Sequence, residues 1–181
     1  MTRMSFAFLL LLLLPATLHA QRPFAETADV VGNMLRVFLP ASAWGVTYTQ
    51  NDSEGRAQFY RGIGATVATT VVLKAAVDRD GPTGLRYAFP SDNAALSFSA
   101  ASFAYRRYGW EAWPMYALAT FSAMTRVYID EQRWDEVLAG AAIGVGFSRL
   151  FVDSRDNPAR DLRVALQTAP EEYAIVLTLR W

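Results

Sequence analysis

The side chains with the clearest chemical potential lie in three short stretches of the 181-residue chain. The first holds Lys74, the only lysine among 17 basic residues, in an otherwise apolar segment. The second is the polar cluster 91–93, Ser-Asp-Asn after a proline, and the third begins at Arg126 and continues into an acidic run. A buried charge without a partner is costly, so Lys74 and Arg126 need counter-charges wherever an apolar helix buries them. We therefore treat these stretches as the candidate site.

The histidine and cysteine counts limit what such a site can do. The chain has no cysteine and one histidine, His19. Residues 1–20 are typical of a secretory signal peptide, with basic Arg3, an apolar run over 6–14 and a small-residue cleavage site ending at Ala20. Cleavage there removes His19. The mature chain would then have no histidine acid or base, no thiolate nucleophile, no disulfide and no zinc site of nitrogen and sulfur ligands.

Charge and composition narrow the class of partner. Basic and acidic residues balance at 17 each, which leaves no basic face for nucleic acid. A hydrophobic content of 52% lies well above the disordered range. We expect no cofactor and no metal site. The acids that could bind Mg²⁺ or Ca²⁺ are more typical of a solvated, helix-capping turn; they are Asp130, Glu131, Asp135 and Glu136.

Apolar periodicity and turn signals predict an all-α fold, a compact bundle of about five helices with a small C-terminal β-hairpin. The expected helices are 26–47, 54–77, 92–105, 113–128 and 135–151. Pro40 should break or kink the first of them. Gly140 and Gly144, among alanines of the last, would let a neighbouring helix approach closely. The expected division is a signal peptide over 1–20, a helical domain over 21–160 and the hairpin over 161–181.

The sequence allows two interpretations of how the chain relates to a membrane. Beyond the signal, no uninterrupted apolar run reaches the roughly 18 residues that would indicate a spanning helix. The aromatic and arginine residues of 105–113 fit a helix–helix corner, which we favour, or an interfacial belt. The sequence therefore allows peripheral membrane contact, favours a spanning segment less, and leaves a soluble or an embedded chain open.

Together the three stretches resemble the type 2 phosphatidic acid phosphatase family, which belongs with vanadium haloperoxidases and bacterial acid phosphatases. The family pattern is Lys-x6-Arg-Pro, then Pro-Ser-Gly-His, then Ser-Arg-x5-His-x3-Asp. The corresponding segments here are 74–82, 89–94 and 125–140, and the resemblance spans about 52–151. It implies a helical phosphatase in which cations neutralise the phosphoryl oxygens. One histidine protonates the leaving oxygen, and a second, oriented by the aspartate, attacks phosphorus.

By this resemblance the chain keeps part of the phosphate cradle. Lys74, Ser91 and Arg126 match the family's phosphate contacts. Gly81 stands where the first-motif arginine belongs, and Arg79, two residues away, is the candidate to replace it.

The catalytic positions are all altered. Asn93 and Gln132 stand at the two histidine positions, and Glu136 stands at the orienting aspartate. An amide is neither a useful acid nor a nucleophile, so we expect a loss of catalysis of about a millionfold and no intact catalytic residue.

A carboxylate also enters the second motif, where Asp92 replaces the family's glycine. Our hypothesis is that Asp92 and Glu136 pair with Lys74 and Arg126 and close the former phosphate site. In the competing interpretation, Ser-Asp-Asn is only a helix N-cap, which needs no ligand.

The sequence therefore favours an exported protein of the periplasm or cell envelope that is catalytically inactive and has a binding or structural role. The expected partner is a phosphorylated lipid or its headgroup. The alternative is an active phosphatase, acting on a phosphoric monoester or a lipid phosphate through a non-histidine nucleophile such as a carboxylate.

Overall fold

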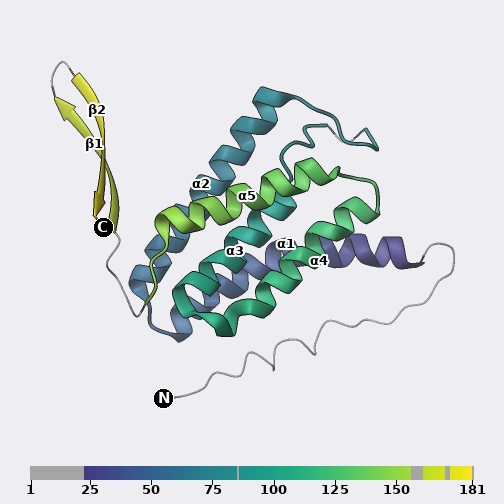
Figure 1. Ribbon diagram of the computed structural model, residues 1–181, viewed down its shortest axis with the longest axis horizontal. Helices are drawn as coiled ribbons and strands as arrows, with labels where there is room; N and C mark the ends of the chain where they lie inside the picture. Colours follow the sequence, from purple (N-terminus) through teal and green to yellow (C-terminus); the bar gives the residue numbers. More distant parts are fainter. Residues whose placement is uncertain (1–22, 85, 156–160, 170–171, 181) are drawn as a thin grey trace.

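The computed structural model describes residues 23–84, 86–155, 161–169 and 172–180, the last two ranges by their backbone alone. The signal peptide expected over 1–20 lies outside the described residues. Five α-helices and one 3-10 turn build the bundle (Figure 1). Their bounds are α1 Pro23–Thr49, α2 Ser53–Val77, α3 Asp92–Tyr108, η2 Trp110–Ala112, α4 Trp113–Tyr128 and α5 Trp134–Phe151. The helical class and the number of helices predicted from the sequence are confirmed.

Two strands follow the helices, β1 (Asp161–Ala169) and β2 (Glu172–Arg180). They pair antiparallel, with Asp161 opposite Arg180. The hairpin's place in the fold, and the division at residue 160, stay predictions.

Helix α3 is the central element, because it packs against α1, α2, α4 and α5 (Figure 1). Small side chains on a central helix let its neighbours approach closely. The buried small residues of α3 are Ala94, Ala95, Ser97, Ser99, Ala100, Ala101, Ser102 and Ala104. This close packing fixes the N-terminal end of α3, where the second motif lies.

Helix α1 runs unbroken through Pro40, so the expected break at this residue does not occur. Proline removes one helical hydrogen bond and crowds the preceding turn, which destabilises a helix interior by about 3 kcal/mol. The face of α1 that includes Leu35, Leu39 and Ala43 is nevertheless buried on both sides of the proline. Burial of this continuous apolar face offsets the local penalty, as tertiary packing commonly does.

A buried ion pair joins the start of α2 to the end of α3. The Arg107 Nε and Nη2 atoms each donate to a carboxylate oxygen of Asp52 at 2.7 Å, and Tyr108 Oη donates to the same group at 3.1 Å. Asp52 also caps α2 by accepting from the Gly55 N–H at 2.8 Å. Burial raises the pKa of Asp52, but the hydrogen bonds from Arg107 and Gly55 outweigh it and hold the pKa at about 2.

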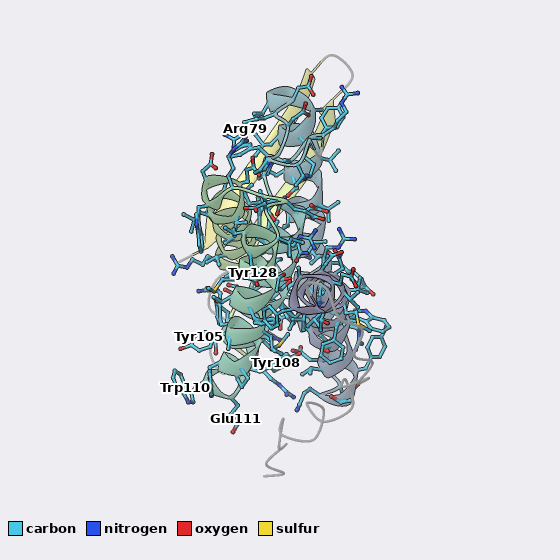
Figure 2. The ribbon with its side chains drawn as sticks, turned by 90° about the vertical axis from the view of Figure 1, so that its right-hand side faces the viewer. Arg79, Tyr105, Tyr108, Trp110, Glu111 and Tyr128 are labelled. Carbon is cyan, nitrogen blue, oxygen red and sulfur yellow. The ribbon has the colours of Figure 1, made fainter. Side chains whose placement is uncertain are left out.

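The aromatic corner lies at the opposite end of the molecule from Arg79 (Figure 2). Tyr105 packs edge-on against Trp110, which stacks on Trp113. Tyr108 instead turns inward toward Asp52, so it does not belong to an outward belt. The tryptophan rings are exposed, at 71% for Trp110 and 50% for Trp113. Within residues 23–84 and 86–155, no helix has both the length and the apolar character that a bilayer crossing requires.

Two glycines of α5 set the distance between α5 and α3. A Cβ atom at Gly140 would overlap the Ser91 carbonyl oxygen, and one at Gly144 would overlap the carbonyl oxygen of Ala95. The small-residue pattern thus serves helix packing in the way that the sequence predicted. It brings the second and third motifs together, and the Ser91 N–H donates to the Glu136 carbonyl at 2.9 Å.

Gly140→Ala should therefore destabilise the bundle by about 1–3 kcal/mol, because the obstacle is backbone that can yield only if the helices separate. Urea unfolding followed by circular dichroism measures the change. Gly146→Ala is the matched control, since nothing lies within 4 Å of a Cβ there. Its better helix propensity should leave stability unchanged or raise it by up to about 1 kcal/mol. Equal losses for both variants would contradict the close-packing account.

Candidate functional site

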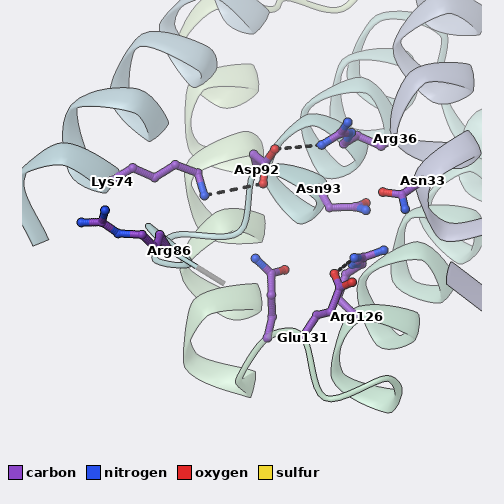
Figure 3. A pocket seen from close by; sticks show the side chains of 9 residues that line it. Asn33, Arg36, Lys74, Arg86, Asp92, Asn93, Arg126 and Glu131 are labelled. Carbon is purple, nitrogen blue, oxygen red and sulfur yellow. Dashed lines mark hydrogen bonds and ion pairs between the residues drawn. The ribbon is translucent and has the colours of Figure 1, made fainter. Parts of the chain in front are cut away.

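The three sequence motifs meet at one pocket of ≈ 320 Å³ (Figure 3). Its walls come from α1 to α4, from the α2–α3 loop and from the loop that joins α4 to α5. The lining residues are Asn33, Arg36, Lys74, Arg86, Asp92, Asn93, Arg126, Glu131 and Gln132. Four of these side chains are basic and two are acidic, so the pocket itself has an excess of positive charge.

Lys74 reaches the pocket from the C-terminal part of α2. Its Nζ donates to the Tyr87 carbonyl oxygen at 2.6 Å and lies 3.6 Å from Asp92 Oδ1. The other oxygen of Asp92 accepts from Arg36 Nη1 at 3.0 Å. The Asp92 carboxylate is thus held between cations of α1 and α2 (Figure 3). The part of our hypothesis in which Asp92 pairs with Lys74 therefore agrees with the structure.

Arg126 has different counter-charges from those that we expected. Its Nη1 donates to Asp29 Oδ1 at 2.6 Å, and its Nη2 forms an ion pair with Glu131. Asp29 comes from α1 and Glu131 from the loop after α4. These partners satisfy the largely buried guanidinium, so Asp92 and Glu136 are not needed for that role.

Glu136 is fully buried and pairs elsewhere, which corrects the other half of the hypothesis. Its Oε1 accepts from Arg79 at 3.0 Å and from Arg133 at 3.2 Å, and its Oε2 accepts from the Arg133 N–H at 2.9 Å. The carboxylate therefore caps the first turn of α5 and does not fill a phosphate site.

Arg79 shares this cluster and is not among the residues that line the pocket. Its Nη2 also donates to Asp135 at 2.6 Å, and this bond raises the pKa of Arg79 and lowers that of Asp135. Two carboxylates already bind its guanidinium, so the geometry does not bring Arg79 to the place of the missing first-motif arginine.

Ser91 acts as the N-cap of α3. Its Oγ accepts from the Ala94 N–H at 3.2 Å, and the residue is fully buried and is not among those that line the pocket. The capping interpretation of this residue therefore describes its contacts, while its neighbours Asp92 and Asn93 line the pocket.

The two amides that the family resemblance aligns with the histidine positions are buried, and each has one polar atom without a hydrogen-bond partner among the described residues. Asn93 is 3% exposed, and its Oδ1 accepts from Ser122 Oγ at 2.7 Å. Gln132 is 4% exposed, and its Nε2 donates to the Ala88 carbonyl oxygen at 3.3 Å. Asn93 Nδ2 and Gln132 Oε1 have no hydrogen-bond partner among the described residues. Both residues line the pocket, so they offer a ligand one donor and one acceptor.

Sequence reasoning missed the contribution of α1, namely Asp29, Asn33 and Arg36. These residues lie outside the three motifs, and no local signal marks them. No group of three or more histidine, cysteine, aspartate or glutamate residues that could hold a metal ion occurs within the part of the chain that the structure describes.

The helical fold and the converging motifs define the class of protein. The chain belongs to the type 2 phosphatidic acid phosphatase superfamily of phosphatases. It is 33% identical over 168 residues to a lipid A 4'-phosphatase of Helicobacter pylori. The match covers 86% of this chain and 84% of that protein. No protein-family model matches the chain.

A solved structure agrees with the fold. The crystal structure of Aquifex aeolicus LpxE matches with a TM-score of 0.50 and 18% sequence identity. The match covers 68% of this chain and 91% of that one. At this identity the likeness bears on the fold alone.

Proposed function

We propose that the chain binds a phosphate group of a lipid or lipid headgroup in this pocket and does not hydrolyse it through a phosphohistidine. The observation that carries the proposal is the lining itself. Cations from α1, α2 and α4 surround a pocket in which amides, Asn93 and Gln132, stand at both histidine positions. Such donors stabilise a phosphate anion, but neither amide can take over proton transfer or attack on phosphorus.

Two observations support a lipid as the source of the phosphate. The Helicobacter pylori relative is named for action on lipid A. A second depression, of ≈ 350 Å³, shares Lys74 with the pocket and is otherwise lined by Val71, Ala75, Tyr87 and the acidic Asp78. An amphiphile could place its phosphate at Lys74 and an apolar portion beside it. The signal peptide predicted over residues 1–20 supports export to the cell envelope, where the chain would meet such a lipid at a membrane surface.

The second candidate is hydrolysis with a carboxylate nucleophile. It is favoured by one observation, that Asp92 and Glu131 both line the pocket. Each of these carboxylates is engaged by cations, Asp92 by Arg36 and Lys74 and Glu131 by Arg126. Attack on phosphorus would have to break these ion pairs, so we place binding first.

Lys74→Ala should weaken phosphate binding about tenfold, because it removes a charge-assisted contact. The unmodified chain should release no nitrophenol from p-nitrophenyl phosphate. Binding is measured as the rise in melting temperature of the mature chain with increasing inorganic phosphate. The matched control is Arg61→Ala, which removes an exposed cation of the same helix that does not line the pocket.

Three outcomes separate the candidates. A phosphate response that only Lys74→Ala weakens supports the binding site. Turnover that Glu131→Gln or Asp92→Asn abolishes would replace it with the carboxylate phosphatase. The absence of both a response and turnover would contradict phosphate recognition altogether.

A further inference from the structure

We infer that the pocket selects a phosphate group that still carries a proton, a monoanionic phosphate monoester, over oxyanions without one, and that Gln132 makes this selection. The inference rests on the proposed function, since it concerns which phosphate the same pocket binds. It depends on the orientation of one buried amide and on the charges that surround it.

The orientation of Gln132 is set by its one hydrogen bond. A backbone carbonyl can only accept, so the amide nitrogen must be the end that faces Ala88, at 3.3 Å. The oxygen Oε1 is then the free end, and it is buried with no partner among the residues that the structure describes. A buried acceptor without a donor is unfavourable, so a ligand that supplies a donor gains over one that does not.

A protonated phosphate monoester supplies that donor and satisfies the rest of the lining. Its P–O–H group can donate to Gln132 Oε1. Its unprotonated oxygens can accept from Lys74, Arg126 and the free Nδ2 of Asn93. No bond to phosphorus forms or breaks in this step, and the proton stays on the phosphate.

The acidic side chains of the pocket favour the same ligand. Asp92 and Glu131 carry negative charge at the pocket wall. The cations of the lining attract a dianion more strongly than a monoanion, and these two carboxylates offset part of that attraction, because both effects grow with the charge of the ligand. A sulfate ion therefore gains less from the cations than it would without these acids, and it leaves Gln132 unsatisfied, while its tetrahedral shape resembles that of phosphate.

The ligand's proton should dominate the pH dependence, because none of the charged groups around Gln132 is a histidine. The second pKa of a phosphate monoester is about 6, so the ligand changes charge between about pH 5 and about pH 8. Arginine, lysine and carboxylate side chains ordinarily titrate outside this interval. The charged groups that face the pocket or pack behind it are Asp29 and Arg36 of α1, Lys74 of α2, Arg79 and Arg86 of the α2–α3 loop, Asp92 of α3, Arg126 of α4, Glu131 and Arg133 of the α4–α5 loop, and Asp135 and Glu136 of α5.

The test is calorimetric titration of the mature chain with methyl phosphate and with sulfate, at matched ionic strength, at about pH 5 and about pH 8. At the lower pH, methyl phosphate should bind about tenfold or more tightly than sulfate. Its affinity should fall about tenfold or more at the higher pH, where little of the monoanion remains, while any weak sulfate binding should stay level. These comparisons use the unmodified chain and need no variant to fold.

Gln132→Met then assigns the effect to one atom, because it removes the acceptor while keeping a side chain of similar length. The preference for methyl phosphate over sulfate should shrink to within about threefold, and the fall with pH should flatten. A circular dichroism melt of the variant checks that it folds. If it does not, the unmodified chain still decides whether the pocket selects a protonated ligand.

The outcomes distinguish this inference from the proposed function. Equal affinity for methyl phosphate and sulfate, or methyl phosphate binding that does not weaken as the pH rises, would overturn the selection and leave phosphate binding in place. Binding of neither anion would overturn the proposed function and the selection with it. An unchanged preference in a folded Gln132→Met variant would remove Gln132 from its role.

Discussion

Replacing Asp52 with asparagine should lower the free energy of unfolding by about 3–5 kcal/mol. The carboxylate receives two 2.7 Å bonds from Arg107, a third from Tyr108 and the capping bond from Gly55. Asparagine cannot balance the arginine's charge, and Arg107 is only 4% exposed. The variant leaves a buried cation without its counter-charge at the joint between α2 and α3, and urea unfolding measures the loss.

The control for this prediction is the second carboxylate that pairs with Arg107, that of Glu54. Glu54 Oε2 is 3.4 Å from Arg107 Nη2, but its side chain is 59% exposed. Exposed ion pairs contribute about 0–1 kcal/mol, so Glu54→Gln should change stability little. Comparable losses in the two variants would show that total charge, and not the buried pair, stabilises this end of the bundle.

The same pair predicts a dependence on pH. The pKa of Asp52 is about 2 in the folded chain, below the ordinary value of 3.8. A lowered carboxyl pKa means that the folded state binds the proton less readily than the unfolded state. The contribution to stability is therefore complete above about pH 4 and is lost as the pH falls through about 2. Urea titrations at pH values across this interval should show a fall that is smaller in Asp52→Asn.

The predictions from the sequence were best where local signals are strong. The expected 113–128 helix coincides with α4, because a proline near its start and a turn after Tyr128 mark both ends. The expected break at Pro40 was wrong because proline is a local signal, whereas the burial that overrides it depends on how the helix packs. Propensity alone contains no information about that packing.

The residues of the site also divide into those that local sequence signals could predict and those that depend on packing. Lys74, Asp92, Asn93, Arg126 and Gln132 could be expected together because the family motifs place them on helices that meet. The counter-charges could not be expected in the same way. Which carboxylate faces Arg126 depends on the position of α1 against α4, and no residue near Asp29 in the sequence indicates that contact.

Asp92→Asn should raise the affinity of the pocket for phosphate ten- to a hundredfold, the largest effect that we expect on binding. The Asp92 carboxylate lies 3.0 Å from Arg36 and 3.6 Å from Lys74, so it competes with a phosphate for both cations. The amide keeps the shape of the side chain while removing the competing charge. Calorimetric titration with methyl phosphate at about pH 5 measures the gain.

Asp135→Asn is the matched control, because it removes a charge of the same sign beside Arg79, a residue that does not line the pocket. The side chains around Asp92 are partly exposed, so its loss should change stability by no more than about 1 kcal/mol. A gain in affinity in Asp92→Asn alone, with stability preserved, would identify Asp92 as an internal substitute for the phosphate. A variant that binds no more tightly, or whose free energy of unfolding falls by several kcal/mol, would instead show that the ion pairs of Asp92 stabilise the packing of α1 and α2 against α3. In that case the pocket would already be open to its ligand, and Asp92 would not compete with the phosphate for Arg36 and Lys74.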